Sequence, residues 1–116
     1  MNTKHVTSPK IAKQLAEAGI VIESEFWWGI DGDLMYRPLL PNPHVDVPAP
    51  IATEILEWFP KGYDFGFELI KLGEGYGAIC KDYRVMPYER IGFEKDDNAS
   101  NALALLLIRL TKDGLI

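Results

Sequence analysis

The sequence contains little of what usually marks metal chemistry or secretion. Among 116 residues there is one cysteine, and there are two histidines. A single cysteine cannot form the internal disulfides on which short secreted domains often depend, so a reducing, cytoplasmic compartment is expected. His5 and His44 have no companion residues at zinc-binding spacing, so the sequence predicts no metal site and no cofactor.

Long hydrophobic runs are also missing. The most apolar stretch, Ala102–Leu110, covers nine residues, whereas a membrane-spanning helix needs about 20. Residues 1–7 hold no apolar segment of the kind that signal peptides contain. We therefore expect a cytoplasmic protein with no membrane partner.

Basic residues are too few and too scattered for a nucleic-acid surface. The 12 Lys and Arg are outnumbered by 17 Asp and Glu, which gives a net charge of −5. The only local concentration is small and consists of Lys4, His5, Lys10 and Lys13; it is typical of a solvated helix face. Because phosphate binding needs clustered Lys and Arg, no nucleic-acid partner is expected.

What the chain does contain is typical of one folded domain. Its residues are 47% hydrophobic and 25% charged, which is ordinary for a globular protein and unlike a disordered one. The length fits a single domain over residues 1–116, with enough chain for one core.

Three segments have the signals of helices. Ser8 before Pro9 combines a hydroxyl cap with proline in the first turn, which predicts a helix over Pro9–Ala18. Apolar residues at helical spacing predict two more helices, over Ile51–Phe59 and Ala99–Lys112.

Four segments alternate as strands do. Residues 20–28 and 34–37 are expected to pair through a two-residue turn at Asp31-Gly32, and residues 64–72 and 76–83 through a glycine-rich turn. The proline-rich connector, residues 38–50, cannot supply a central strand.

We expect residues 84–97 to be an irregular connection. The predicted order is therefore α-β-β-α-β-β-α. This order indicates a two-layer α+β fold in which helices pack on one face of an antiparallel sheet of about four strands.

The last predicted helix is apolar on two sides. Its main stripe must face the core and consists of Ala99, Ala102, Leu103, Leu106, Leu107 and Leu110. Leu105 and Ile108 lie on the opposite side, where either the proline-rich connector or a second copy of the chain could cover them. These two residues are therefore candidates for a homodimer interface.

Trp27 and Trp28 are adjacent in a predicted strand, so their side chains point to opposite faces. Both can be core residues, or one can be exposed for a partner, since Trp is enriched at the centre of interfaces.

Three residues are candidates for catalysis. Glu23 and Glu25 lie on the same face of a strand, and paired carboxylates can act as acid and base. His44 precedes an aspartate by two residues and could act as a base beside the proline-rich connector. Solvated strand and loop residues are the competing interpretation for all three.

Cys80 lies in a strand with no histidine nearby, so the sequence predicts an inert buried thiol rather than a nucleophile.

Helix caps and core positions recur in Ser8–Ile20 with Glu23–Trp28, in Pro50–Pro60 and in Asn98–Leu107. In these segments the chain resembles a family of small uncharacterised proteins from phages, prophages and gut bacteria. The resemblance implies a mobile-element origin, and no catalytic residues come with it.

The sequence as a whole favours a small, non-enzymatic binding protein that acts as a homodimer or with a protein partner. The contact would involve Leu105, Ile108, and Trp27 or Trp28. The alternative is a small enzyme that uses Glu23, Glu25 or His44 in a cleft.

Overall fold

A computed structural model describes residues 5–38 and 46–116 of the chain. The helices are α1 (Pro9–Glu17), α2 (Ala52–Trp58) and α3 (Ala99–Lys112). The strands are β1 (Phe26–Trp28), β2 (Leu34–Tyr36), β3 (Val47–Pro48), β4 (Phe65–Leu72), β5 (Gly75–Asp82) and β6 (Glu89–Asp96). The α+β class and the predicted order are confirmed, with one further strand after each predicted hairpin.

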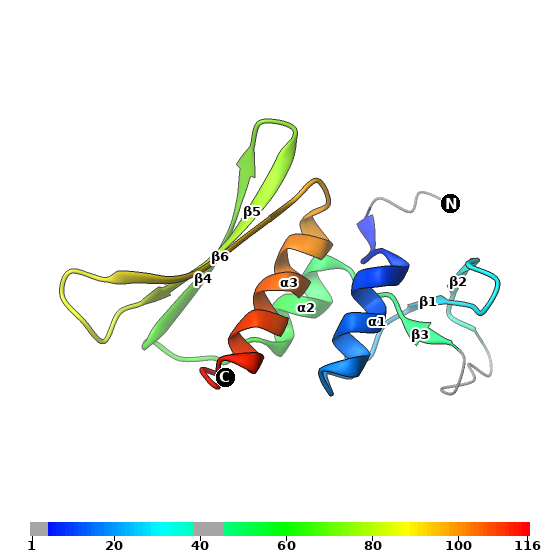
Figure 1. Ribbon diagram of the computed structural model, residues 1–116, viewed down its shortest axis with the longest axis horizontal. Coiled ribbons are helices and arrows are strands. Elements are labelled where there is room, and N and C mark those ends of the chain that lie inside the picture. Colours follow the sequence, from blue (N-terminus) through cyan, green and yellow to red (C-terminus); the bar gives the residue numbers. More distant parts are fainter. Residues whose placement is uncertain (1–4, 39–45) are drawn as a thin grey trace.

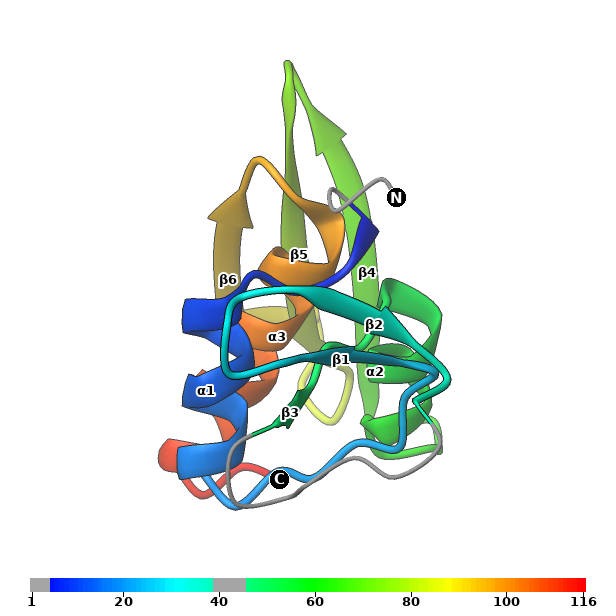
Figure 2. The ribbon, with the colours of Figure 1, turned by 90° about the vertical axis from the view of Figure 1, so that its right-hand side faces the viewer.

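The strands form two antiparallel three-stranded sheets, of order β2-β1-β3 and β4-β5-β6. Figure 1 shows the helices between the two sheets. Helix α3 packs on β5 and β6, and α1 and α2 contact α3. Helix α1 also packs on β3, in the smaller sheet that faces the viewer in Figure 2.

The first helix forms as the sequence predicts. The Ser8 Oγ accepts a hydrogen bond from the Ile11 amide, and Pro9 occupies the first turn. Gly19 has a φ of +79° directly after the C-cap, a conformation that glycine adopts without steric cost.

Strand β6 corrects the expectation of an irregular connection over residues 84–97. It pairs with β5 along its whole length, with an irregularity between Cys80 and Lys81. Its sequence is rich in charge and contains Gly92, both unfavourable for a strand by propensity alone. Tertiary pairing with β5 overrides this preference, and the charges are acceptable because β6 is an edge strand.

The turn between β1 and β2 is longer than predicted. Trp28 pairs with Leu34, so residues 29–33 form the loop, which a hydrogen bond from the Gly29 amide to the Asp33 carbonyl closes at 2.8 Å. The expectation of a two-residue turn was wrong. The packing of Trp28 and Leu34 in one small core, with Val6, Ala12 and Ala49, sets the register instead.

Helix α3 is the centre of the larger core. Leu103, Leu106, Leu107 and Leu110 are fully buried, and Ile108 is only 6% exposed. On the second apolar side of α3, Ile108 is therefore covered within the chain, while Leu105 is half-buried; α1 and α2 both contact α3. In the described part of the chain, no helix has the length and apolar character needed to cross a bilayer.

Polar contacts connect the start of the chain to the start of α3. The Ser100 hydroxyl donates to the His5 carbonyl at 2.6 Å, and the Asn98 amide group donates to the Val6 carbonyl at 2.7 Å. These bonds cross more than 90 residues of sequence and fix the first described segment against the helical layer.

Candidate functional site

The two faces of the β4-β5-β6 sheet have different surroundings. One face packs on α3: a Cβ placed at Gly92 would lie 2.9 Å from the Leu106 Cδ1. In Figure 1 the helices lie on that side, and no described element lies on the other. We call the second surface the open sheet face. It carries, by strand pairing, Gly66, Glu68, Ile70, Leu72, Gly77, Ile79, Lys81, Arg90, Phe93 and Lys95.

An apolar cluster lies at the middle of the open sheet face. A Cβ at Gly77 would meet Leu72 Cδ1 at 2.8 Å, Phe93 Cε2 at 2.9 Å and Ile70 Cγ1 at 3.3 Å. The missing side chain at Gly77 thus lets three apolar side chains, two from β4 and one from β6, close over the backbone of β5. Ile79 lies in the same cluster, paired with Phe93. Apolar side chains therefore gather on a surface that no second layer covers.

Aromatic side chains extend this surface toward the loop between β5 and β6. The Tyr83 ring covers Gly66, whose Cβ would lie 2.5 Å from the Tyr83 Cε2. Tyr83 and Tyr88 are 43% and 52% exposed, and their ring centroids are 5.6 Å apart. Exposed tyrosines beside an apolar cluster are typical of a protein-binding surface.

The charges of the open sheet face are predominantly positive. Lys81 pairs with Glu68 at 2.8 Å and also lies 4.8 Å from the centroid of the Tyr88 ring. Arg90 lies 5.2 Å from the centroid of the Phe93 ring. Among the described residues, Arg90 and Lys95 form no ion pair. The face therefore holds one neutral pair and two uncompensated cations.

The two residues predicted at a homodimer interface line a separate groove between α1, α3 and β6. Leu105 is half-buried and Ile108 is nearly buried. The groove has a volume of about 570 Å³. Its rim carries both signs of charge, with Glu17 and Asp113 against Lys112.

The two tryptophans of β1 have different environments. Trp28 is 7% exposed, and its indole N–H donates to the Thr7 carbonyl at 2.7 Å. It is a core residue of the smaller sheet. Trp27 is half-buried on the opposite face, and its N–H donates to the Ser24 carbonyl at 3.2 Å. Of the pair, only Trp27 has surface left for a partner.

The candidate catalytic residues do not form a cluster in the described part of the chain. Glu23 and Glu25 are both exposed, and the Glu25 carboxylate forms a salt bridge with Arg37. His44 lies outside the described residues. Across residues 5–38 and 46–116, no group of three His, Cys, Asp or Glu side chains is arranged to hold a metal ion.

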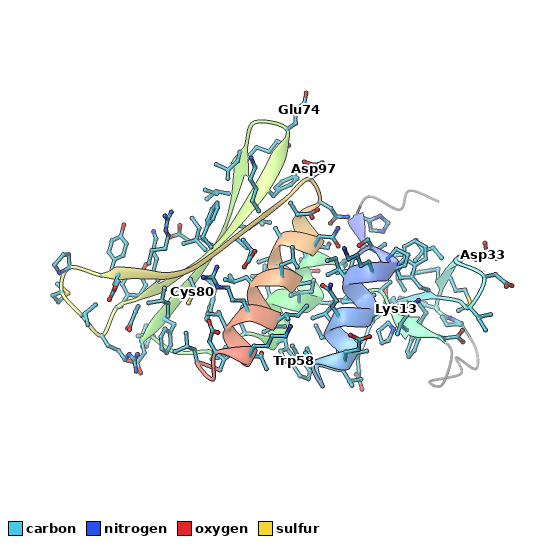
Figure 3. All side chains as sticks on the ribbon, viewed as in Figure 1. Lys13, Asp33, Trp58, Glu74, Cys80 and Asp97 are labelled. Carbon is cyan, nitrogen blue, oxygen red and sulfur yellow. The ribbon has the colours of Figure 1, made fainter. Side chains whose placement is uncertain are left out.

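Cys80 is buried between β5 and α3, as Figure 3 shows. Burial, with the nearby Asp82 carboxylate, raises the pKa of its thiol to about 11. The thiolate is scarce at neutral pH, which is the behaviour expected of a structural cysteine.

The sequence pattern did not predict the open sheet face. Phe93, Arg90 and Lys95 were missed because residues 84–97 lacked a recognisable strand pattern. The available signal for a strand was an alternation with period two over residues 90–95. The bulge beside Cys80 interrupts this alternation.

Comparison with known proteins gives no match to a family model, a curated protein or a solved structure.

Proposed function

We propose that this chain is a non-enzymatic binding protein and that the open sheet face receives a protein partner. The observation that carries the proposal is the partly exposed apolar cluster of Ile70, Leu72 and Phe93, which no described element covers; Ile79, in the same cluster, is itself only 7% exposed. Monomeric proteins rarely leave contiguous apolar surface uncovered unless it is used in binding.

The rigidity of this surface supports the proposal. Strands β4, β5 and β6 each have eight residues and are paired along their length. Helix α3 packs on the other face. A surface that is ordered before binding loses little conformational entropy when a partner arrives.

A selection of displayed peptides on the immobilised protein tests the proposal. Enriched peptides are then measured against wild type and against Ile70→Thr/Leu72→Thr, in which threonine retains a preference for strands. We expect the double variant to lose binding. The matched control is Val21→Thr/Ile30→Thr, which removes two residues that are 65% and 74% exposed elsewhere. Equal binding by all three proteins would refute the open sheet face as the binding surface.

Self-association through the groove is a second candidate function. It is favoured by Leu105 and Ile108 in the groove and by the mixed charges of its rim, because a two-fold contact requires a self-complementary surface. Leu105→Glu is the suitable variant, since Leu105 is half-buried, whereas a charge at Ile108 would disturb the core. A dimer that becomes a folded monomer in light scattering supports this function; a wild-type monomer at high concentration refutes it.

The enzymatic alternative with Glu23, Glu25 or His44 is less favoured, because both glutamates are exposed and Glu25 is paired with Arg37. The mobile-element origin implied by the resemblance stays a prediction.

A further inference from the structure

The open sheet face carries a positive charge, opposite in sign to the net charge of the whole chain. The chain carries a net charge of −5, yet the face holds Arg90 and Lys95 without ion-pair partners among the described residues. Among the described residues of the face, the one acidic side chain is that of Glu68, which accepts a hydrogen bond from Lys81. The excess positive charge on this face is therefore local.

The two uncompensated cations flank the apolar cluster. In the strand register, Arg90 lies opposite Lys81 near one end of β6, and Lys95 lies opposite Gly77 near the other end. Phe93 lies between the two cations. Because the bulge adds one residue to β6, these two positions lie opposite residues four apart on β5, a span of roughly 13 Å. A complementary ligand would carry two acidic groups at about this separation and apolar side chains between them.

We infer that the partner of the open sheet face is an acidic protein segment whose carboxylates pair with Arg90 and Lys95 and whose apolar side chains cover Ile70, Leu72 and Phe93. This inference rests on the proposed function and specifies the chemistry of the partner. Charge complementarity of this kind selects partners and raises the rate of association.

A nucleic acid fits the same face less well. Phosphates would be attracted to Arg90 and Lys95, and a base could stack on an aromatic ring such as that of Tyr88, but the aliphatic side chains of the cluster offer a polyanion neither charge nor a surface for base stacking. Two uncompensated cations also provide few phosphate contacts, and the remaining acidic surface repels a polyanion.

Fluorescence anisotropy with three labelled probes tests the inference. The first probe is a short peptide in which Glu alternates with Val and Tyr; the second has Lys at each Glu; the third is a short oligothymidylate. We expect the Glu peptide to bind more tightly than the other two, and its binding to weaken as salt is added.

Arg90→Glu/Lys95→Glu should weaken binding of the Glu peptide by about tenfold or more, which corresponds to about 1.4 kcal/mol. The matched control is Lys10→Glu/Lys13→Glu, with the same change in net charge at exposed positions of α1. Lys13 lies on the far side of α3 from the sheet (Figure 3). We expect less than about a twofold effect from this control, because solvent charges beyond about 10 Å are screened.

Three outcomes would overturn the inference: tighter binding of the Lys peptide, binding of oligothymidylate that the Arg90 and Lys95 reversals abolish, or no measurable binding of the Glu peptide. Binding to Ile70→Thr/Leu72→Thr shows whether only the acidic partner is refuted or the proposed function as well. If the Lys peptide binds wild type and is lost from that variant, the open sheet face remains a binding surface and only its acidic partner is refuted. If a peptide binds wild type and both double variants, Ile70→Thr/Leu72→Thr and Arg90→Glu/Lys95→Glu, with equal affinity, both proposals are refuted.

Discussion

Strands β4, β5 and β6 each have eight residues, whereas β1, β2 and β3 have three, three and two. The longer sheet packs on α3 and shares the larger core with it. The smaller sheet has a core of few residues around Trp28 and Val6. Hydrogen bonds from buried side chains supplement that core, such as the one from the Trp28 indole to Thr7.

This difference indicates where a binding surface can be maintained. A sheet fixed on one face by a buried helix can leave apolar side chains on its other face and remain folded. The smaller sheet needs its apolar side chains for its own core, since short strands need packing against other elements for stability. Its exposed positions are accordingly poorer candidates for a partner.

The largest effect is expected from Leu106→Ala. Leu106 is fully buried in α3, so truncation should lower the free energy of unfolding by about 2–5 kcal/mol through lost burial and a cavity. Urea denaturation measures this change. Cys80 gives a second readout, because its buried thiol reacts with a thiol reagent only after the longer sheet opens. A change below about 1 kcal/mol would contradict the central role given to α3.

Trp28→Phe comes next and tests whether the two sheets unfold together. The variant leaves the Thr7 carbonyl without the indole donor, and we expect a loss of about 1–3 kcal/mol. If the smaller sheet opens independently, amide exchange in β1 accelerates while Cys80 labelling stays at the wild-type rate. If the opening free energy reported by Cys80 labelling falls by the same amount as the one reported by amide exchange in β1, the two sheets unfold as one cooperative unit.

Two glycine variants compare the two faces of the longer sheet. Gly92→Ala brings a methyl group against Leu106 and Leu110 in the packed core, where overpacking costs about 1–3 kcal/mol. Gly77→Ala meets Leu72 and Phe93 on the open sheet face, where both side chains can move into solvent. Gly92→Ala should therefore destabilise the protein more in urea denaturation. The reverse order would show that the open sheet face is packed as tightly as the core.

The smallest effect concerns pH. The Arg84 guanidinium and the Arg84 backbone amide donate to the Asp82 carboxylate at 2.9–3.0 Å and lower its pKa. A carboxylate with a lowered folded-state pKa contributes stability above its unfolded value of about 3.9 and loses it as the pH falls through the folded value. Asp82→Asn should thus lower the melting temperature at pH 7.

The difference between Asp82→Asn and wild type should disappear as acid is added below about pH 4. Melting curves at decreasing pH measure it. The control is Asp33→Asn at an exposed position in the β1–β2 loop, shown in Figure 3. A constant difference at every pH would mean that Asp82 acts through packing rather than charge.

The sequence by itself determined the three helices, four of the six strands and the α+β class. Local signals were sufficient for these elements: Ser8 and Pro9 at the start of α1, the apolar periodicity of α3, and the glycine turn between β4 and β5. Each signal depends on residues close together in the chain, which act on the backbone without help from distant segments. The burial of Cys80 was also predicted, whereas the sequence left open which of the two tryptophans is buried.

Only the tertiary structure decided the division into two sheets, the register of β1 with β2, and the surface proposed for binding. Strand β6 exists because β5 offers it hydrogen-bonding partners, and the charges of Arg90 and Lys95 concealed it in the sequence. Leu105 and Ile108 stay candidates for an interface, and the sequence could not indicate that they line a groove with α1 and β6 in which Ile108 is nearly buried. Such contacts join residues that are distant in the chain, and they cannot be inferred from local conformational preferences.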